Sequence, residues 1–433
     1  MRTRLFVSLV LLAATSFAAS ADNWPGFRGP AGNGHADGKN VPTQWGEKEN
    51  VRWRTAVHGK GWSSPVVFGN QVWVTTADEV IDTAPPPKGK GGPPANPVKE
   101  VSLYAVGVDR ASGKVIHDLK LGVVQKPQYC HPFNSYASST PYIEDGRLYA
   151  HFGSLGTYCV DTATGKTLWE RPDFKCDHFR GAASSPVVYG DLLYLIFDGA
   201  DYQYVAALDK KTGETKWKAD RKIKYSTDNG DYKKGYGTPA LFTVDGKPWL
   251  VCPSAECTIA YDPKTGHELW RATHGGMNES IRPMMANGLL YLNSGHTAKL
   301  LALKVGDLRG AVPKEAAAWQ VAKDVSVRSS PLVAGDLVFM VSDAGIATCH
   351  DAKTGQLVWR ERLDGEFSAS PVLAGGNVYF CNQTGKTFVV KADREYSLVA
   401  ENRLADGFMA SPAIAGDELF LRTKTHLYSI GKK

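Results

Sequence analysis

The sequence contains few cysteines for its length, and they form neither an adjacent pair nor a Cys-x-x-Cys pair. It has seven Cys in 433 residues. Closely spaced zinc ligands and c-type haem attachment both need the Cys-x-x-Cys spacing, so the sequence predicts neither. In an oxidising compartment, a disulfide could form between Cys252 and Cys257 across a turn. A second could form between Cys130 and Cys176 and link consecutive repeats.

No apolar run long enough to cross a bilayer follows the first 21 residues. Those residues carry Arg2 and Arg4, an apolar stretch over 5–14 and small residues at 19–21, which is the pattern of a cleaved secretory signal. No Cys follows that could accept a lipid. We therefore expect a signal peptide over 1–21 and a periplasmic or secreted protein. We expect it to be neither a lipoprotein nor membrane-spanning.

Charge is not concentrated in any part of the chain. Without the two signal arginines the formal net charge falls from +6 to +4, and Lys and Arg occur at most in pairs such as Lys210-Lys211. Nucleic-acid-binding proteins carry a clustered basic surface. The sequence therefore predicts no nucleic-acid partner.

What the sequence does contain is a repeat that opens with proline. Eight short apolar segments begin with Pro, and in six of them Ser-Ser, Ser-Thr or Ala-Ser comes first. After the first interval, the prolines follow one another at steps of 40 to 53 residues. A period of this size, filled with short strands and tight turns, is typical of a β-propeller. The prolines are Pro65, Pro141, Pro186, Pro239, Pro283, Pro331, Pro371 and Pro412.

A second element recurs later in each repeat, most clearly as Asp161, Gly165 and Trp169 in the stretch 161–169. An indole between neighbouring blades buries a large area and can place its N–H on a partner, so we interpret the repeating Trp as structural. His117 takes the Trp place in the first repeat, and the seventh has no Trp. The repeating tryptophans are Trp169, Trp217, Trp270 and Trp359.

The repeat predicts an all-β fold, an eight-bladed propeller with four antiparallel strands per blade in one domain over 22–433. In the third repeat we expect strands over 183–189, 192–197 and 204–208 and a fourth ending near Trp217. The last repeat stops before its fourth strand, whereas residues 50–54 have the fourth-strand pattern, with Trp53 in the Trp place. We expect this N-terminal strand to complete the last blade and close the ring.

The pattern Asp-x-x-Thr-Gly-x-x-x-Trp, with Ser-x-Pro openings, resembles the PQQ-like β-propeller repeat over essentially the whole mature chain. That repeat occurs in quinoprotein alcohol dehydrogenases and in outer-membrane assembly propellers of the BamB type. The resemblance implies the fold but says little about function, because these residues pack the blades. It leaves two alternatives open: a PQQ-dependent alcohol or aldose dehydrogenase, and a BamB-like assembly scaffold.

For each alternative, this sequence lacks a feature that the resemblance implies. The dehydrogenase resemblance implies PQQ in the central channel beside Ca²⁺, with adjacent cysteines forming a disulfide against the quinone, and no Cys-Cys pair exists here. BamB-type propellers are anchored through an N-terminal Cys, which is missing. We therefore predict no catalytic residues, no PQQ and no Ca²⁺. The expected function is that of an exported, non-catalytic propeller that binds an envelope protein, a glycan or a small ligand.

The repeat is interrupted in the first blade. Residues 78–100 form an insertion rich in Pro, Gly and Lys, a composition that cannot bury a core. We expect an extended or disordered excursion there, either a solvated loop or a docking segment.

The repeat is also interrupted by polar loops before repeats two to six. In a propeller these loops share one face with the loops between strands two and three, so their residues should meet at the channel mouth. We predict a ligand or partner site on this face of blades 2–6. The alternative is that these side chains only satisfy the loops and one another. The candidates are His131, Asn134, His178, Arg180, Asp198, Asp201, Gln203, Asp228, Glu279, Arg282 and Arg328.

Asp228 and Asp231, together with Asp198 and Asp201, could offer oxygen ligands to Ca²⁺. The Glu that completes a calcium loop does not follow them. We therefore predict no metal ligands.

Overall fold

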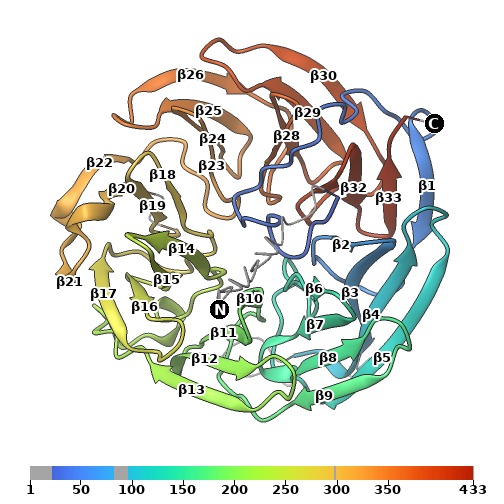
Figure 1. Ribbon diagram of the computed structural model, residues 1–433, viewed down its shortest axis with the longest axis horizontal. Helices are drawn as coiled ribbons and strands as arrows, with labels where there is room; N and C mark the ends of the chain where they lie inside the picture. The colour runs from blue at the N-terminus through green and yellow to red at the C-terminus, as the bar shows by residue number, and fades with distance from the viewer. Residues whose placement is uncertain (1–21, 82–95, 297–298, 433) are drawn as a thin grey trace, which may run out of the picture.

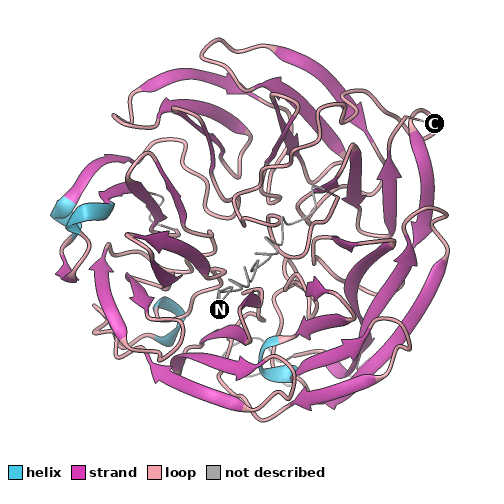
Figure 2. Cartoon of the chain, viewed as in Figure 1, coloured by secondary structure: helices cyan, strands magenta, loops and turns pink. Residues whose placement is uncertain are grey.

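The chain winds into a ring of eight sheets around a central channel, as the computed structural model shows for residues 22–81, 96–296 and 299–432 (Figure 1). Helix in this part of the chain is limited to four short 3-10 segments, η1 Gly153–Leu155, η2 Gly230–Tyr232, η3 Val305–Asp307 and η4 Lys314–Ala316 (Figure 2). The predicted all-β, eight-bladed propeller is confirmed. The predicted signal peptide over 1–21 lies outside the described residues. In the part of the chain described, no helix has the length and apolarity needed to cross a bilayer.

Each blade runs from the channel to the rim in four antiparallel strands (Figure 1). The innermost strands are β2 Val66–Phe68, β6 Tyr142–Glu144, β10 Val187–Tyr189, β14 Ala240–Val244, β18 Met284–Ala286, β23 Leu332–Ala334, β27 Val372–Ala374 and β31 Ala413–Ala415. The second strands are β3 Gln71–Ile81, β7 Arg147–His151, β11 Leu192–Asp198, β15 Lys247–Cys252, β19 Leu289–Asn293, β24 Leu337–Val341, β28 Asn377–Cys381 and β32 Glu418–Arg422. The third strands are β4 Val98–Asp109, β8 Thr157–Asp161, β12 Gln203–Asp209, β16 Cys257–Tyr261, β20 Leu300–Lys304, β25 Ile346–Asp351, β29 Lys386–Lys391 and β33 His426–Ile430. The outermost strands are β5 Val115–Gln125, β9 Thr167–Arg171, β13 Thr215–Asp220, β17 Glu268–Thr273, β22 Ala317–Val321, β26 Leu357–Arg362, β30 Leu398–Arg403 and β1 Val51–Ala56.

The ring is closed by the N-terminal strand, as predicted. β1 pairs antiparallel with β33 and forms the outer edge of the last blade. Trp53 of β1 donates its indole N–H to the carbonyl of Arg110 in the first blade, at 2.7 Å. Its ring covers Gly113, where a Cβ would lie only 2.6 Å from the indole. The first and last parts of the chain are thereby joined in one sheet and across one blade interface.

The repeating tryptophans connect neighbouring blades. Trp169 donates its N–H to the carbonyl of Lys210 at 3.1 Å and packs on Gly213 of the next blade's turn. The first blade uses His117 instead, whose ring nitrogen lies 3.2 Å from the carbonyl of Thr162. The structural interpretation of these aromatic residues is therefore confirmed. The same bond is made by Trp217 to Pro263, Trp319 to Ala352 and Trp359 to Asp393.

Trp270 is more deeply buried than the other repeating tryptophans and is held differently. Its indole N–H has no partner among the described residues, and its ring packs edge-on against Trp249. In the following blade an insertion replaces the Asp-to-Gly turn, and its short strand β21 Gly310–Val312 pairs in parallel with β17. Blade 4 therefore has a fifth strand on its outer edge.

The residues that precede the repeating prolines form a belt of hydrogen bonds around the channel. The backbone N–H of seven of these eight residues donates to the side-chain hydroxyl of the equivalent residue in the next blade, as from Ser64 to Thr140 at 2.9 Å. Thr238 lacks this link among the described residues, because Arg282 occupies the next position and carries no hydroxyl. Seven links are made: Ser64 to Thr140, Thr140 to Ser185, Ser185 to Thr238, Arg282 to Ser330, Ser330 to Ser370, Ser370 to Ser411 and Ser411 to Ser64.

Removing one hydroxyl from this belt is expected to destabilise the protein. Ser330→Ala should lower the free energy of unfolding by about 1–2 kcal/mol, because the buried N–H of Arg282 loses its acceptor. Ser329→Ala is the matched control: its neighbouring hydroxyl is equally buried but has no partner. Denaturant midpoints of the two variants test the belt, and an equal loss in both would contradict it.

The first blade is longer than the others and corrects one expectation. β3, β4 and β5 have 11, 12 and 11 residues, so Asp78–Ile81 and Val98–Glu100 are strand rather than loop. Val98 and Val101 are buried in one cluster with Tyr136 of the following loop, which explains why these ends are ordered. Residues 82–95 of the predicted excursion lie outside the described residues.

The two disulfides that the spacing allowed are not formed. All seven cysteines, each within the described residues, are free. Cys252 lies opposite Ile259 and Cys257 opposite Thr273, so they are not cross-strand partners.

A segment for which the sequence made no prediction crosses the ring (Figure 1). Residues 24–36, here called the strap, begin with a two-way backbone pairing of Trp24 with Val67 in β2. They end where Ala36 donates to the carbonyl of Leu373 in β27. The strap therefore contacts the innermost strands of blades 1 and 7.

Two buried arginines hold the strap in place without any carboxylate. Arg28 donates to the carbonyls of Asn33 and Pro331 at 2.9 Å and of Pro371 at 3.3 Å. Arg282 donates to the carbonyl of Phe27 at 2.9 Å. Burial, and then the charge of Arg282, lower the pKa of Arg28 to about 9.

Candidate functional site

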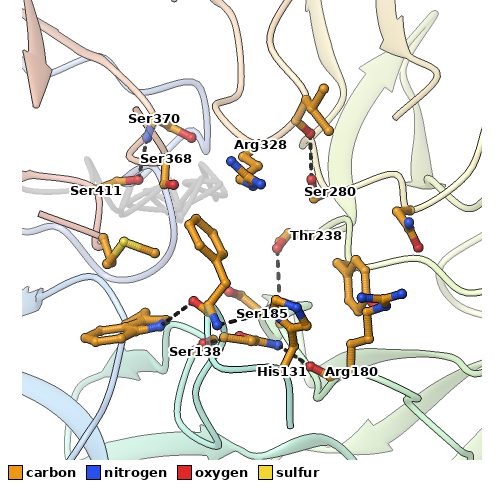
Figure 3. Close-up of a pocket in the computed structure, with 18 of the residues that line it drawn as sticks. His131, Ser138, Arg180, Ser185, Thr238, Ser280, Arg328, Ser368, Ser370 and Ser411 are labelled. Atoms are coloured by element: carbon orange, nitrogen blue, oxygen red, sulfur yellow. Dashed lines mark hydrogen bonds between the residues drawn. The ribbon is translucent and has the colours of Figure 1, made fainter. Parts of the chain in front are cut away.

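A cavity of about 510 Å³ lies at the mouth of the channel and is lined by loops from all eight blades (Figure 3). The residue three positions before each repeating proline lines it in every blade. These residues are Trp62, Ser138, Ala183, Tyr236, Ser280, Arg328, Ser368 and Met409. The residue one position before the proline lines it in six blades: Ser64, Thr140, Ser185, Thr238, Ser370 and Ser411.

This register explains how the loops build the wall. Alternate residues of an extended segment point to opposite sides, so positions one and three before the proline face the channel together. The side chain two positions before the proline points into the blades instead. There the hydroxyls of Ser139, Ser184 and Ser329 are buried without a partner among the described residues. Phe27 also lines the cavity, so the strap forms part of its wall.

Two guanidinium groups lie in the wall. Arg328 forms an ion pair with Asp343 at 2.8 Å and stacks over the ring of Phe133 at 4.1 Å. Arg180 forms a looser ion pair with Asp231 at 3.4 Å. Both side chains remain partly exposed to the cavity.

Asp231 is shared between Arg180 and a buried lysine. Lys234 donates to the Asp231 carbonyl at 2.7 Å and also contacts its carboxylate. Burial, and then the charge of Arg180, lower the pKa of Lys234 to about 7. This carboxylate is therefore already engaged by two basic side chains.

Two histidines line the same cavity and are held neutral. Burial lowers the pKa of His131, and the charges of Arg180, Lys60 and Arg328 lower it further. Burial and Arg328 likewise lower the pKa of His296. The wall thus carries a positive potential near both imidazoles.

Four of the eleven predicted residues line the cavity: His131, Asn134, Arg180 and Arg328. The amide of Asn134 donates to the carbonyl of Arg180 at 3.1 Å, which ties the loops before blades 2 and 3 together. The structure brings these four residues together at the cavity, and their role in binding stays a prediction.

The other seven lie outside the wall, and four of them are buried. His178 accepts a hydrogen bond from the Ser154 N–H at 3.0 Å, and burial lowers its pKa to about 4. Asp198 forms a buried ion pair with Arg221 at 2.5 Å. Glu279 accepts from the N–H of Ile281, and burial raises its pKa well above the usual value. The fourth, Arg282, turns to the strap, so these residues support loops rather than face the channel.

The last three are not buried: Asp201 and Asp228 lie on loops, and Gln203 is the first residue of β12. Asp201 accepts the N–H of Asp177 at 2.7 Å, and Gln203 donates to the carbonyl of Gly199 at 2.7 Å. The side chain of Asp228 is fully exposed. Of the four aspartates considered for Ca²⁺, Asp231 lines the cavity and the other three do not. The described residues contain no group of three His, Cys, Asp or Glu placed to hold a metal ion.

The sequence analysis did not identify several wall residues. Many of them occupy one position of the repeat, three residues before the proline. Trp62, Tyr236 and Met409 all stand three residues before a repeating proline. Asn278 and His296 lie elsewhere in their loops and follow no such rule. The missed signal was the register within the opening segment, not the composition of the loops.

A second hollow of about 660 Å³ lies beside β21 at the rim of blade 4. Its buried carboxylate, Glu256, already accepts the N–H and the hydroxyl of Ser226. The channel-mouth cavity is therefore the stronger candidate site.

One family model matches the chain over residues 98–219 and 201–433, and its description is "Outer membrane protein assembly factor BamB". Among curated proteins, the 1-butanol dehydrogenase (quinone) of Thauera butanivorans is 33% identical over 173 residues. That match covers 35% of this chain and 23% of the dehydrogenase, so the chain aligns with about a quarter of that relative.

Solved structures share the fold at low identity. Quinohemoprotein alcohol dehydrogenase from Comamonas testosteroni superimposes with a TM-score of 0.66 at 12% identity, covering 96% of this chain and 82% of that one. BamB from Moraxella catarrhalis superimposes with a TM-score of 0.53 at 13% identity, covering 82% of this chain and 98% of that one. These likenesses establish the propeller architecture and nothing about chemistry.

Proposed function

The chain belongs to the PQQ-like β-propeller family, and on this premise we propose that it is an exported, non-catalytic protein that binds a small polar ligand at its channel mouth. Export is supported by the secretory pattern of residues 1–21 and by the outer-membrane role in the family model's description. The fold serves enzymes and scaffolds alike, so the proposal rests on the cavity itself.

The observation that carries the proposal is a set of unused hydrogen-bond donors in the wall. Six belt hydroxyls line the cavity, and each accepts one backbone N–H. A hydroxyl has one hydrogen to donate as well, and none of these six donates to a described residue. Polar groups gathered in a cavity with hydrogen-bonding capacity to spare are what a ligand site offers.

The dehydrogenase alternative does not fit these residues. Ca²⁺ takes about six to eight oxygen ligands, many of them carboxylates. Among the described wall residues Asp231 is the one carboxylate, and Arg180 and Lys234 hold it. The adjacent cysteines of those enzymes are also missing. No reaction step is therefore assigned to a quinone here.

Filling the cavity is expected to abolish ligand binding. Ala183 lines the wall, so Ala183→Trp should remove the thermal stabilisation produced by the ligand. The probes are monosaccharides, sugar acids, amino acids and dicarboxylates, screened by melting temperature and confirmed by calorimetry. Ala163→Trp, in an exposed turn, is the matched control and should bind as the wild type does.

Two outcomes would contradict the proposal. One is equal binding by Ala183→Trp and the control, which would place the ligand elsewhere. The other is turnover of alcohols or aldoses with a dye acceptor after addition of PQQ and Ca²⁺, which would make the protein an enzyme. The BamB-like scaffold alternative gains if no small molecule of the panel binds.

A further inference from the structure

We infer that the cavity takes an acidic monosaccharide, a sugar ring that carries a carboxylate. The inference rests on the proposed binding function and adds the chemical class of the ligand. It follows from three properties of the wall: its unpartnered polar atoms, its charge and its apolar side chains.

The unpartnered atoms call for a ligand with hydroxyl groups. Three buried polar atoms of wall residues have no partner among the described residues: Nε of Arg180, the hydroxyl of Tyr236 and Oδ1 of Asn278. Asn278 is 9% exposed, so its amide oxygen is a buried acceptor without a donor. A wall that offers mainly donors and also a lone acceptor suits groups that both accept and donate, as hydroxyls do.

The positions of these groups suit a ring with oxygens around its edge. The three atoms come from the loops before blades 3, 4 and 5, and the belt hydroxyls add donors from blades 1 to 4, 7 and 8. Donors therefore surround the space instead of gathering on one side. A cavity of about 510 Å³ also falls within the range of small-molecule sites.

The positive charge of the wall favours a ligand that also carries a carboxylate. Arg180 and Arg328 each face one carboxylate, and Lys60 adds a further positive charge near His131. The pKa of His131 is lowered by burial and then by all three cations, so the local field is positive. A guanidinium binds a carboxylate through charge-assisted hydrogen bonds.

Apolar side chains also line the wall, among them Phe133, Met277 and Val327. Trp62 of blade 1 and Met409 of blade 8 line the cavity, and Phe27 joins them from the strap. Trp62 places its N–H on the carbonyl of Phe133 at 3.0 Å, so its indole is fixed in orientation. Aromatic and apolar side chains can pack on the C–H face of a sugar ring, while its oxygens reach the donors.

Calorimetric titration of the purified protein tests the inference, with D-glucuronate and D-galacturonate as probes, D-glucose and D-galactose as neutral partners, and acetate as a carboxylate without hydroxyls. We expect a sugar acid to bind about 10- to 100-fold more tightly than its neutral partner, and acetate to bind most weakly. Arg328→Gln should remove this preference, and Arg328→Lys should keep part of it. Arg394→Gln, an exposed arginine paired with Asp336 and Asp351, is the control that should change nothing.

The outcomes separate this inference from the binding function. Equal affinity for acid and neutral sugar, or a preference that survives Arg328→Gln and Arg180→Gln, overturns the inference. A ligand of another class whose binding Ala183→Trp abolishes also overturns it, while the proposed function stands. If no compound binds at all, both are wrong. Melting curves of the arginine variants confirm that each is folded before its titration is interpreted.

Discussion

Arg28→Met is expected to lower the free energy of unfolding by about 3 kcal/mol, a large effect for a residue outside every blade. Three carbonyls, those of Asn33, Pro331 and Pro371, lose their charged donor. Methionine fills similar space and spares the cost of burying a charge, which limits the loss. Denaturant unfolding followed by circular dichroism measures the change.

An exposed arginine provides the control. Arg394→Met removes two ion pairs on the surface and should cost less than about 1 kcal/mol. Arg28 would then matter more than Arg394 although it pairs with no carboxylate. If the two variants lose the same stability, the strap is held by its backbone pairing with β2 and β27 rather than by Arg28.

His178→Gln is expected to make the protein less sensitive to acid. The pKa of His178 is lowered to about 4 by burial, which outweighs the raising effect of Asp201. Between pH 6.5 and 4 the unfolded chain therefore binds the proton that the folded chain refuses, and folding weakens as the pH falls. A shift of about 2.5 units corresponds to about 3 kcal/mol.

The variant is compared with wild type at each pH from 7.5 to 4. Gln keeps an uncharged acceptor for the Ser154 N–H but takes up no proton. The stability difference between wild type and variant should shrink or reverse toward pH 4. Glu279 acts in the opposite direction, because burial raises its pKa, but it is present in both proteins and cancels. A difference that does not change with pH would contradict a buried, neutral His178.

Much of the fold could be predicted because the contacts that form each blade join residues close together in the sequence. The turn from Asp161 to Gly165 and the packing of Trp169 depend on residues near in sequence or one repeat away. The strap could not be predicted in this way. Arg28 contacts a carbonyl 303 residues away, and no repeated sequence pattern predicts that contact.

The site was predicted only in part, and the reason is geometric. Polar composition identified the right loops, and with them His131 and Arg180. It could not tell which side chains face the channel, so Glu279 and Asp198 were included although both are buried. The register before the proline decides the matter, since a shift of one residue reverses the side on which a side chain lies.

This register has a consequence for how the protein can change. The belt residues hold adjacent blades together, whereas the residues two positions earlier face the cavity and take no part in the belt. The position three residues before the proline accepts very different side chains, as Trp62, Ser138, Arg328 and Met409 show. The belt position therefore both joins the blades and lines the cavity, whereas the position two residues earlier lines the cavity without joining the blades. A new specificity can evolve blade by blade, by exchange of single side chains, without loosening the ring.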